Sequence, residues 1–199
     1  MKLSTNCCIR NLNPPSDEHG GGHEWVKDKV IAWSYNRSKV KAVGLFDKDK
    51  GAQKSQGLLN AKVKKAGKKH VAWITIIPGS ELKECFKEKF LVPYAIEELL
   101  PKDVWHYAED KGWLEYRRSP MTLYQFTATN VSFDDHIAQQ LPDKHHQRLA
   151  LRKVALQHKE ALTKFVCKQP EGKRQRMLEG LRPTITESFK KLGLVDDDK

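Results

Sequence analysis

Two short apolar runs with a helical segment between them constrain the fold of this chain more than any other feature. The runs 41–46 (KAVGLF) and 70–77 (HVAWITII) are rich in strand-forming residues, and a Pro-Gly pair stops the second. Between them, 52–65 places leucines and a valine on one side and lysines on the other, which indicates an amphipathic helix. We therefore predict adjacent parallel strands at 42–47 and 70–77, joined by this helix in a right-handed crossover.

A succession of helix, strand, helix and strand is typical of an α/β protein, because a further helix is expected at about 23–35. The predicted fold class is therefore α/β, with a mostly parallel sheet flanked by helices and a basic C-terminal helical segment. We expect an irregular segment at 1–22, an α/β domain at 23–143, a basic helical segment packed on it at 144–193, and a tail at 194–199. Other helices are expected at about 80–90, 93–100, 104–112, 144–167, 174–180 and 183–192, and an edge strand at 123–129.

Composition excludes several classes of protein. In 199 residues, no apolar run approaches the roughly 20 residues that a transmembrane helix needs, so no membrane partner is expected. The four cysteines form no CxxC pair, which argues against a zinc site or a disulfide framework and suits a reducing compartment. The first residues also lack an apolar core of signal-peptide length, so a cytoplasmic location is expected.

Positive charge is concentrated in two segments. The chain carries a net charge of +11, and the segments 37–70 and 144–193 each carry +9 around an acidic middle. Such basic surfaces typically bind the phosphates of nucleic acid, and the alternative is a merely solvated helix face on a basic protein. The candidate phosphate-binding residues are Lys48, Lys50, Lys54, Arg148 and Arg152.

Two aspartates follow the first predicted strand. Asp47 and Asp49 are two positions apart, so in an extended chain both carboxylates point the same way, into the crevice where α/β sheets bind ligands. Two close carboxylates repel each other, and a divalent cation such as Mg²⁺ relieves that repulsion. We predict a magnesium site at Asp47 and Asp49, and the alternative is an ordinary polar strand-to-helix loop.

The segment 39–56 (KVKAVGLFDKDKGAQKSQ) resembles the DxD strand and following helix of a Toprim domain. The helix before it, the strand VAWITIIPG and the basic residues from Lys144 onward are similar to nuclease domains of the overcoming-lysogenization-defect type. The resemblance implies a Mg²⁺-dependent nuclease that acts on DNA or RNA, and we expect DNA before RNA as the partner. It also implies that Glu97, in PYAIEELLP, acts with Asp47 and Asp49 in catalysis and helps to bind a second metal ion.

One departure from the Toprim pattern concerns an upstream glutamate. Toprim domains carry it on a first strand, and 1–16 contains no acidic residue. We expect that none of Asp17, Glu18 and Glu24 reaches Asp47, so that either Glu97 or a partner chain supplies the missing acid if the site is catalytic. The alternative function is a non-catalytic nucleic-acid-binding module with the same fold, so the isolated chain is expected to bind nucleic acid and to cut it slowly or not at all.

Overall fold

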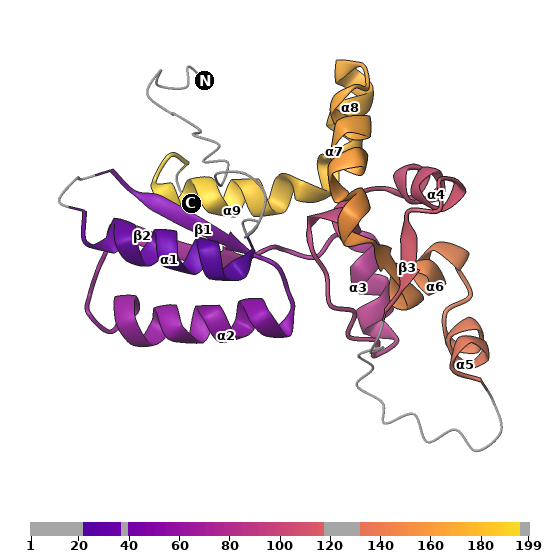
Figure 1. The fold of residues 1–199 in the computed structure, drawn as a ribbon, viewed down its shortest axis with the longest axis horizontal. Helices are drawn as coiled ribbons and strands as arrows, with labels where there is room; N and C mark the ends of the chain where they lie inside the picture. Colours follow the sequence, from indigo (N-terminus) through magenta and orange to yellow (C-terminus); the bar gives the residue numbers. More distant parts are fainter. Residues whose placement is uncertain (1–21, 37–39, 118–131, 196–199) are drawn as a thin grey trace.

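The computed structural model describes residues 22–36, 40–117 and 132–195 (Figure 1). The helices are α1 (His23–Ser34), α2 (Lys50–Leu59), α3 (Ser80–Lys87), α4 (Lys102–Asp110), α5 (Phe133–Gln140), α6 (Lys144–Leu151), α7 (Lys159–Cys167), α8 (Glu171–Met177) and α9 (Arg182–Leu192). The strands are β1 (Ala42–Phe46), β2 (Val71–Thr75), β3 (Leu114–Tyr116) and β4 (Arg152–Val154). A π-helical turn (Asn60–Lys64) continues α2, and 3₁₀ turns span Ile96–Leu99, Leu156–His158 and Glu179–Leu181.

The predicted β-α-β unit is confirmed. Strands β1 and β2 pair in parallel, with Ala42 opposite Val71 and Phe46 opposite Thr75, and α2 with its π turn connects them. Helices α1 and α2 lie on one side of this pair and α9 lies on the other (Figure 1). Helix α1 packs closely against β1 at Gly44, where a Cβ atom would lie only 2.7 Å from Val30 Cγ2. The small core between these elements consists of Val30, Phe46, Ala52, Leu59, Val63 and Val71.

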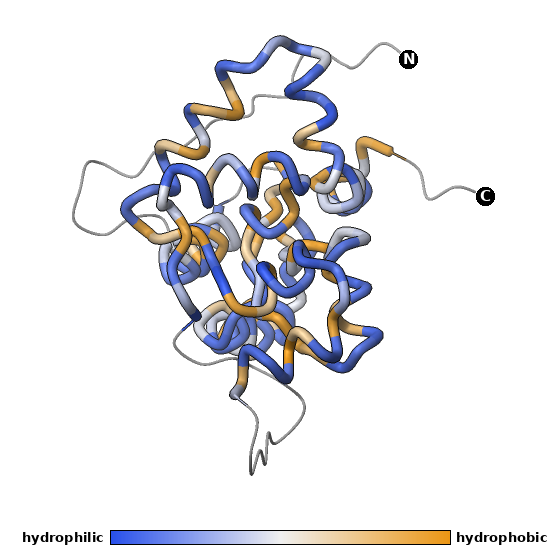
Figure 2. Tube along the Cα trace, turned by 90° about the vertical axis from the view of Figure 1, so that its right-hand side faces the viewer, coloured by the Kyte–Doolittle hydropathy of each residue, from blue (hydrophilic) through white to orange (hydrophobic). Residues whose placement is uncertain are grey.

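A second and larger apolar core is formed by buried residues between Ile76 and Met177. Strands β3 and β4 pair antiparallel in this part of the molecule, with Leu114 opposite Val154. Helices α3 to α7 surround this pair and bury large side chains such as Trp105. Blue and orange alternate along most helices in Figure 2, as expected of amphipathic helices that cover an apolar core.

The long helix predicted at 144–167 is wrong. The structure divides this segment into α6, β4, a 3₁₀ turn and α7. Residues 151–155 do fit a helical apolar stripe, but here Val154 pairs with β3 and Ala155 N–H donates a hydrogen bond to the carbonyl of Trp113. Burial of Val154 and Ala155 in this pairing outweighs local helix propensity.

Other predictions hold in part. The segment 93–100 forms only the 3₁₀ turn Ile96–Leu99, whereas α1, α3, α4 and α9 lie close to their predicted positions. Helix α9 starts with Pro183 in its first turn and is followed by Gly193, whose φ of 71° lies in the left-handed region. The edge strand predicted at 123–129 lies outside the described residues. Within the described ranges, no helix has the length and apolar character needed to span a membrane.

Candidate functional site

A cleft of about 380 Å³ lies at the carboxyl end of β1, between the two apolar cores. The predicted site residues Asp47, Asp49 and Glu97 all line it, so the structure gathers them on one cleft. Four carboxylates and three cationic side chains meet there. The lining residues are Asp47, Asp49, Pro93, Tyr94, Ala95, Glu97, Glu98, Arg117, Lys153, Val154, Leu156 and Lys159.

Asp47 is the first residue after β1, and its side chain is half-buried. Burial raises the pKa of this carboxyl group to about 6. Lys159 opposes the rise, whereas the charges of Glu97, Asp49 and Glu98 add to it. Among the described residues, the Asp47 carboxylate forms no hydrogen bond or ion pair. The cleft therefore contains a partly desolvated carboxylate that lacks a direct partner.

Asp49 has a structural role in addition to lining the cleft. It is the N-cap of α2, and its Oδ1 accepts a hydrogen bond of 2.7 Å from the Ala52 N–H. Between the two aspartates, Lys48 N–H donates a backbone hydrogen bond of 2.8 Å to the Tyr94 carbonyl. This bridge joins the end of β1 to the segment that carries Tyr94, and both aspartates and Tyr94 line the cleft.

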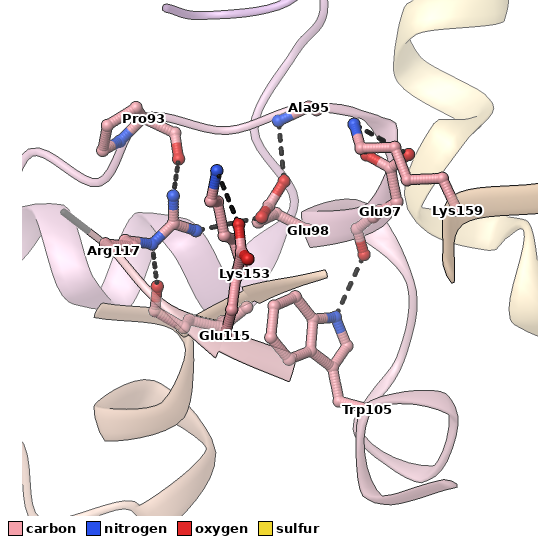
Figure 3. Close-up of polar contacts among 10 residues, drawn as sticks. Pro93, Ala95, Glu97, Glu98, Trp105, Glu115, Arg117, Lys153 and Lys159 are labelled. Atoms are coloured by element: carbon pink, nitrogen blue, oxygen red, sulfur yellow. Dashed lines mark hydrogen bonds and ion pairs between the residues drawn. The ribbon is translucent and has the colours of Figure 1, made fainter. Parts of the chain in front are cut away.

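Glu97 and Lys159 form an ion pair in the wall of the cleft (Figure 3). Both carboxylate oxygens of Glu97 lie 3.1 Å from Lys159 Nζ, and its backbone carbonyl accepts a hydrogen bond from Trp105 Nε1. Burial alone would lower the pKa of Lys159, but the charges of Glu97, Glu98 and Asp47 outweigh it and raise that pKa. Lys159 is therefore a firmly charged cation among the carboxylates of the cleft.

A buried ion pair supports this wall from behind. Arg117 donates to Glu98 Oε1 at 2.9 Å, and its other nitrogens donate to the backbone carbonyls of Pro93 and Leu149 (Figure 3). Burial raises the pKa of Glu98, while Arg117 and a hydrogen bond from the Ala95 N–H act in the opposite direction. Since the bonds of Arg117 join three segments, the pair fixes the turn that carries Glu97.

Sequence reasoning missed the cationic half of the site. Lys153 pairs with Glu115 across β3 and β4 at 3.0 Å and also lines the cleft, as Lys159 and Arg117 do. All three lie far along the chain from Asp47. Lys153 and Lys159 lie within a basic run in which no local pattern distinguishes them from solvent-exposed lysines.

The predicted phosphate-binding residues fall into two groups. Lys48, Lys50 and Lys54 are exposed beside the cleft or on α2. Arg148 is instead paired with Glu109 at 2.6 Å, with only 11% of its side chain exposed. The guanidinium of Arg152 lies 3.8 Å from the ring centre of Tyr116. The last two side chains are therefore already engaged within the protein.

The upstream glutamate of the Toprim pattern has no counterpart in the described N-terminal helix. Glu24 bonds to Lys27 and Ser55 on α1 and α2 rather than to the cleft, whereas Asp17 and Glu18 lie outside the described residues. In the part of the chain that the structure describes, no three His, Cys, Asp or Glu side chains are close enough together to hold a metal ion.

No family model, curated protein or solved structure matches this chain. The interpretation of the site therefore depends on its own geometry.

Proposed function

We propose that the cleft is the site of a Mg²⁺-dependent, Toprim-like phosphodiesterase that acts on nucleic acid, DNA rather than RNA. One observation carries the proposal: Asp47 is a half-buried carboxylate with a raised pKa and no direct partner among the described residues. A group in this state gains most from a cation. Oxygen ligands of this kind suit Mg²⁺, which keeps several waters and needs only one or two carboxylates from the protein.

The donor set fits such an ion in part. Asp47 has both oxygens available, and Asp49 has one that does not cap α2, so the two aspartates would hold the metal. When bound, Mg²⁺ would lower the pKa of a coordinated water and neutralise charge on phosphate oxygens. Glu97 is held by Lys159, so its use as a second-metal ligand requires Lys159 to turn away. Residue order also supports the proposal, because an apolar strand leads directly into the two aspartates and a helix follows them.

The cationic residues have a separate role in this proposal. Lys159 and Lys153 line the cleft with the aspartates, where they would bind the phosphate and orient it toward Asp47. Exposed Lys48, Lys50 and Lys54 would bind neighbouring phosphates. The missing acid would come from a partner chain, so the isolated protein is expected to cut slowly.

The test is metal binding and cleavage by wild type and by Asp47→Asn. Titration with Mn²⁺ should show binding by wild type and at least tenfold weaker binding by the variant. Slow Mg²⁺-dependent nicking of plasmid DNA should disappear in the variant. Asp110→Asn, at an exposed position on α4, is the matched control and should behave as wild type. Equal Mn²⁺ binding by all three proteins would reject the metal site.

A second candidate function is nucleic-acid binding without catalysis. The observation that favours it is the ion pair between Glu97 and Lys159, in which each group already has a charged partner within the protein. Retained DNA binding with no Mn²⁺ binding that depends on Asp47, and no cleavage of plasmid or single-stranded DNA in Mg²⁺ or Mn²⁺, would support this function over the enzyme.

A further inference from the structure

A positively charged surface without acidic residues follows α2 and the π turn after it. Between Lys50 and Ser80 the sequence contains seven lysines and neither Asp nor Glu. Six of these lysines are exposed, and none of the six forms an ion pair among the described residues. We call this set the lysine track; it consists of Lys50, Lys54, Lys62, Lys64, Lys65 and Lys69.

Lys50 and Lys54 of the lysine track lie on the side of α2 that faces away from the core. Ala52, Ser55 and Leu59 are the buried residues of this helix, and at 100° per residue Lys50 and Lys54 lie roughly opposite to them. In the π turn Val63 is buried, whereas its neighbours Lys62 and Lys64 are exposed. The seventh lysine, Lys68, lies over the ring of Tyr35 at 5.3 Å.

The lysine track is continuous with the cleft. Helix α2 begins directly after its N-cap Asp49, which lines the cleft, and then runs away from the centre of the molecule (Figure 1). From Lys50 to Lys65 the helical rise gives a length of about 20 Å. Along the axis of a DNA duplex, the phosphates of one strand are about 3.4 Å apart, so the track spans about six nucleotides of that strand.

We infer that the lysine track binds the phosphate backbone of a polynucleotide and leads it toward the Asp47 cleft. This inference rests on the proposed function and narrows its substrate class to polymers longer than about six nucleotides, as opposed to mononucleotides or dinucleotides. Uncompensated charge that extends from the cleft along α2 and the π turn suits a linear polyanion. An anionic lipid surface would gain nothing from that continuity.

The test compares two triple variants that remove the same charge. Lys54→Gln/Lys62→Gln/Lys65→Gln removes half of the lysine track, and Lys168→Gln/Lys173→Gln/Arg176→Gln removes three exposed cations after α7 and on α8. The probes are fluorescent hairpin duplexes of DNA with 4, 8 and 16 base pairs. Wild type should bind the 8-mer and 16-mer much more tightly than the 4-mer.

The track variant should lose at least tenfold in affinity for the 16-mer at low salt. Its plot of log affinity against log salt should be shallower by about 3, because three phosphate contacts to duplex DNA are lost. The control variant should stay within about threefold of wild type. An equal loss in both variants, no dependence on length, or tighter binding to phosphatidylserine vesicles than to the 16-mer would overturn the inference.

The two proposals fail separately. Mn²⁺ binding depends on Asp47 and should be unchanged in the track variant, so it reports on the cleft alone. Mn²⁺ binding that is lost in Asp47→Asn, together with equal DNA binding by both triple variants, would retain the metal site and reject the lysine track. Length-dependent DNA binding that only the track variant loses, without any Mn²⁺ binding, would retain the track and reject the metal-dependent enzyme.

Discussion

The negative charge of the Asp47 carboxylate lowers the stability of the folded protein. Its pKa is about 6 in the folded protein against an ordinary value of 3.8, because of burial and the neighbouring Glu97, Asp49 and Glu98. The folded state therefore binds this proton more tightly than the unfolded state does. Ionised Asp47 lowers stability fully above about pH 6 and not at all below about pH 3.8. Such a cost is typical of a group kept for binding or catalysis.

Asp47→Asn should accordingly stabilise the protein at neutral pH. We expect the melting temperature at pH 7.5 to rise by about 2–4 °C, which corresponds to about 1 kcal/mol for a chain of this size. The difference from wild type should shrink as the pH falls from 6 to 4, since wild-type Asp47 then becomes protonated. Asp110→Asn should show no such trend across the same pH series. A difference in melting temperature that stays constant with pH would mean that ionised Asp47 does not destabilise the folded protein.

At this scale the sequence predicted the acidic half of the site. Asp47 and Asp49 follow a recognisable strand, and Glu97 lies in a short acidic segment, so local pattern was enough to select them. Lys159 and Arg117 carry no such signal. Only the pairing of β3 with β4 and the turn before α7 bring them to the cleft, and these are long-range contacts that a local pattern does not encode.

At the scale of the elements, the 3₁₀ turns Ile96–Leu99 and Glu179–Leu181 pack against each other at Gly180. A Cβ atom at Gly180 would lie 2.1 Å from the carbonyl oxygen of Leu99, in the turn that carries Glu97. This contact is with backbone, so the turn itself must move to accept a side chain. Gly180→Ala should lower the free energy of unfolding by about 1–3 kcal/mol, as other overpacking substitutions do.

Urea unfolding provides the measurement for this pair of turns, and Gly172 provides the control. No atom lies within 4 Å of a Cβ built at Gly172 on α8, so Gly172→Ala should be neutral or stabilising by up to about 1 kcal/mol. Similar unfolding free energies for both alanine variants would show that the close approach at Gly180 does not constrain the turn.

Elements with a clear apolar pattern could be predicted from the sequence, whereas the three-residue strands could not. Strands β1 and β2 are continuous apolar runs with a clear helix between them, which leaves little ambiguity. Strands β3 and β4 have three residues each, and the spacing around Val154 also fits a helix. Pairing across about 40 residues decides between the two conformations, so the prediction at 144–167 failed where tertiary contacts act against local periodicity.

At the scale of the whole molecule, the last helix completes the fold around the sheet. Helix α9 contacts β1, although it lies more than a hundred residues further along the chain. Thr184 on this helix is 2% exposed, and its hydroxyl accepts a hydrogen bond of 2.9 Å from the Ile77 N–H just after β2. This bond joins α9 to the end of β2, and the Lys48–Tyr94 bridge connects segments that belong to different apolar cores. The position of the cleft between the cores depends on such links.

Thr184→Val tests the link between α9 and the sheet. The variant keeps the shape of the side chain but leaves the Ile77 N–H without its acceptor, which should cost about 1–2 kcal/mol in the free energy of unfolding. Hydrogen exchange at the Ile77 amide should become faster. Thr184→Ser keeps the hydroxyl and should retain the slow exchange, while Thr163→Val, at an exposed position on α7, should change stability by less than about 0.5 kcal/mol. If the Ile77 amide exchanges equally slowly in Thr184→Val and Thr184→Ser, the hydroxyl does not secure α9 to the sheet.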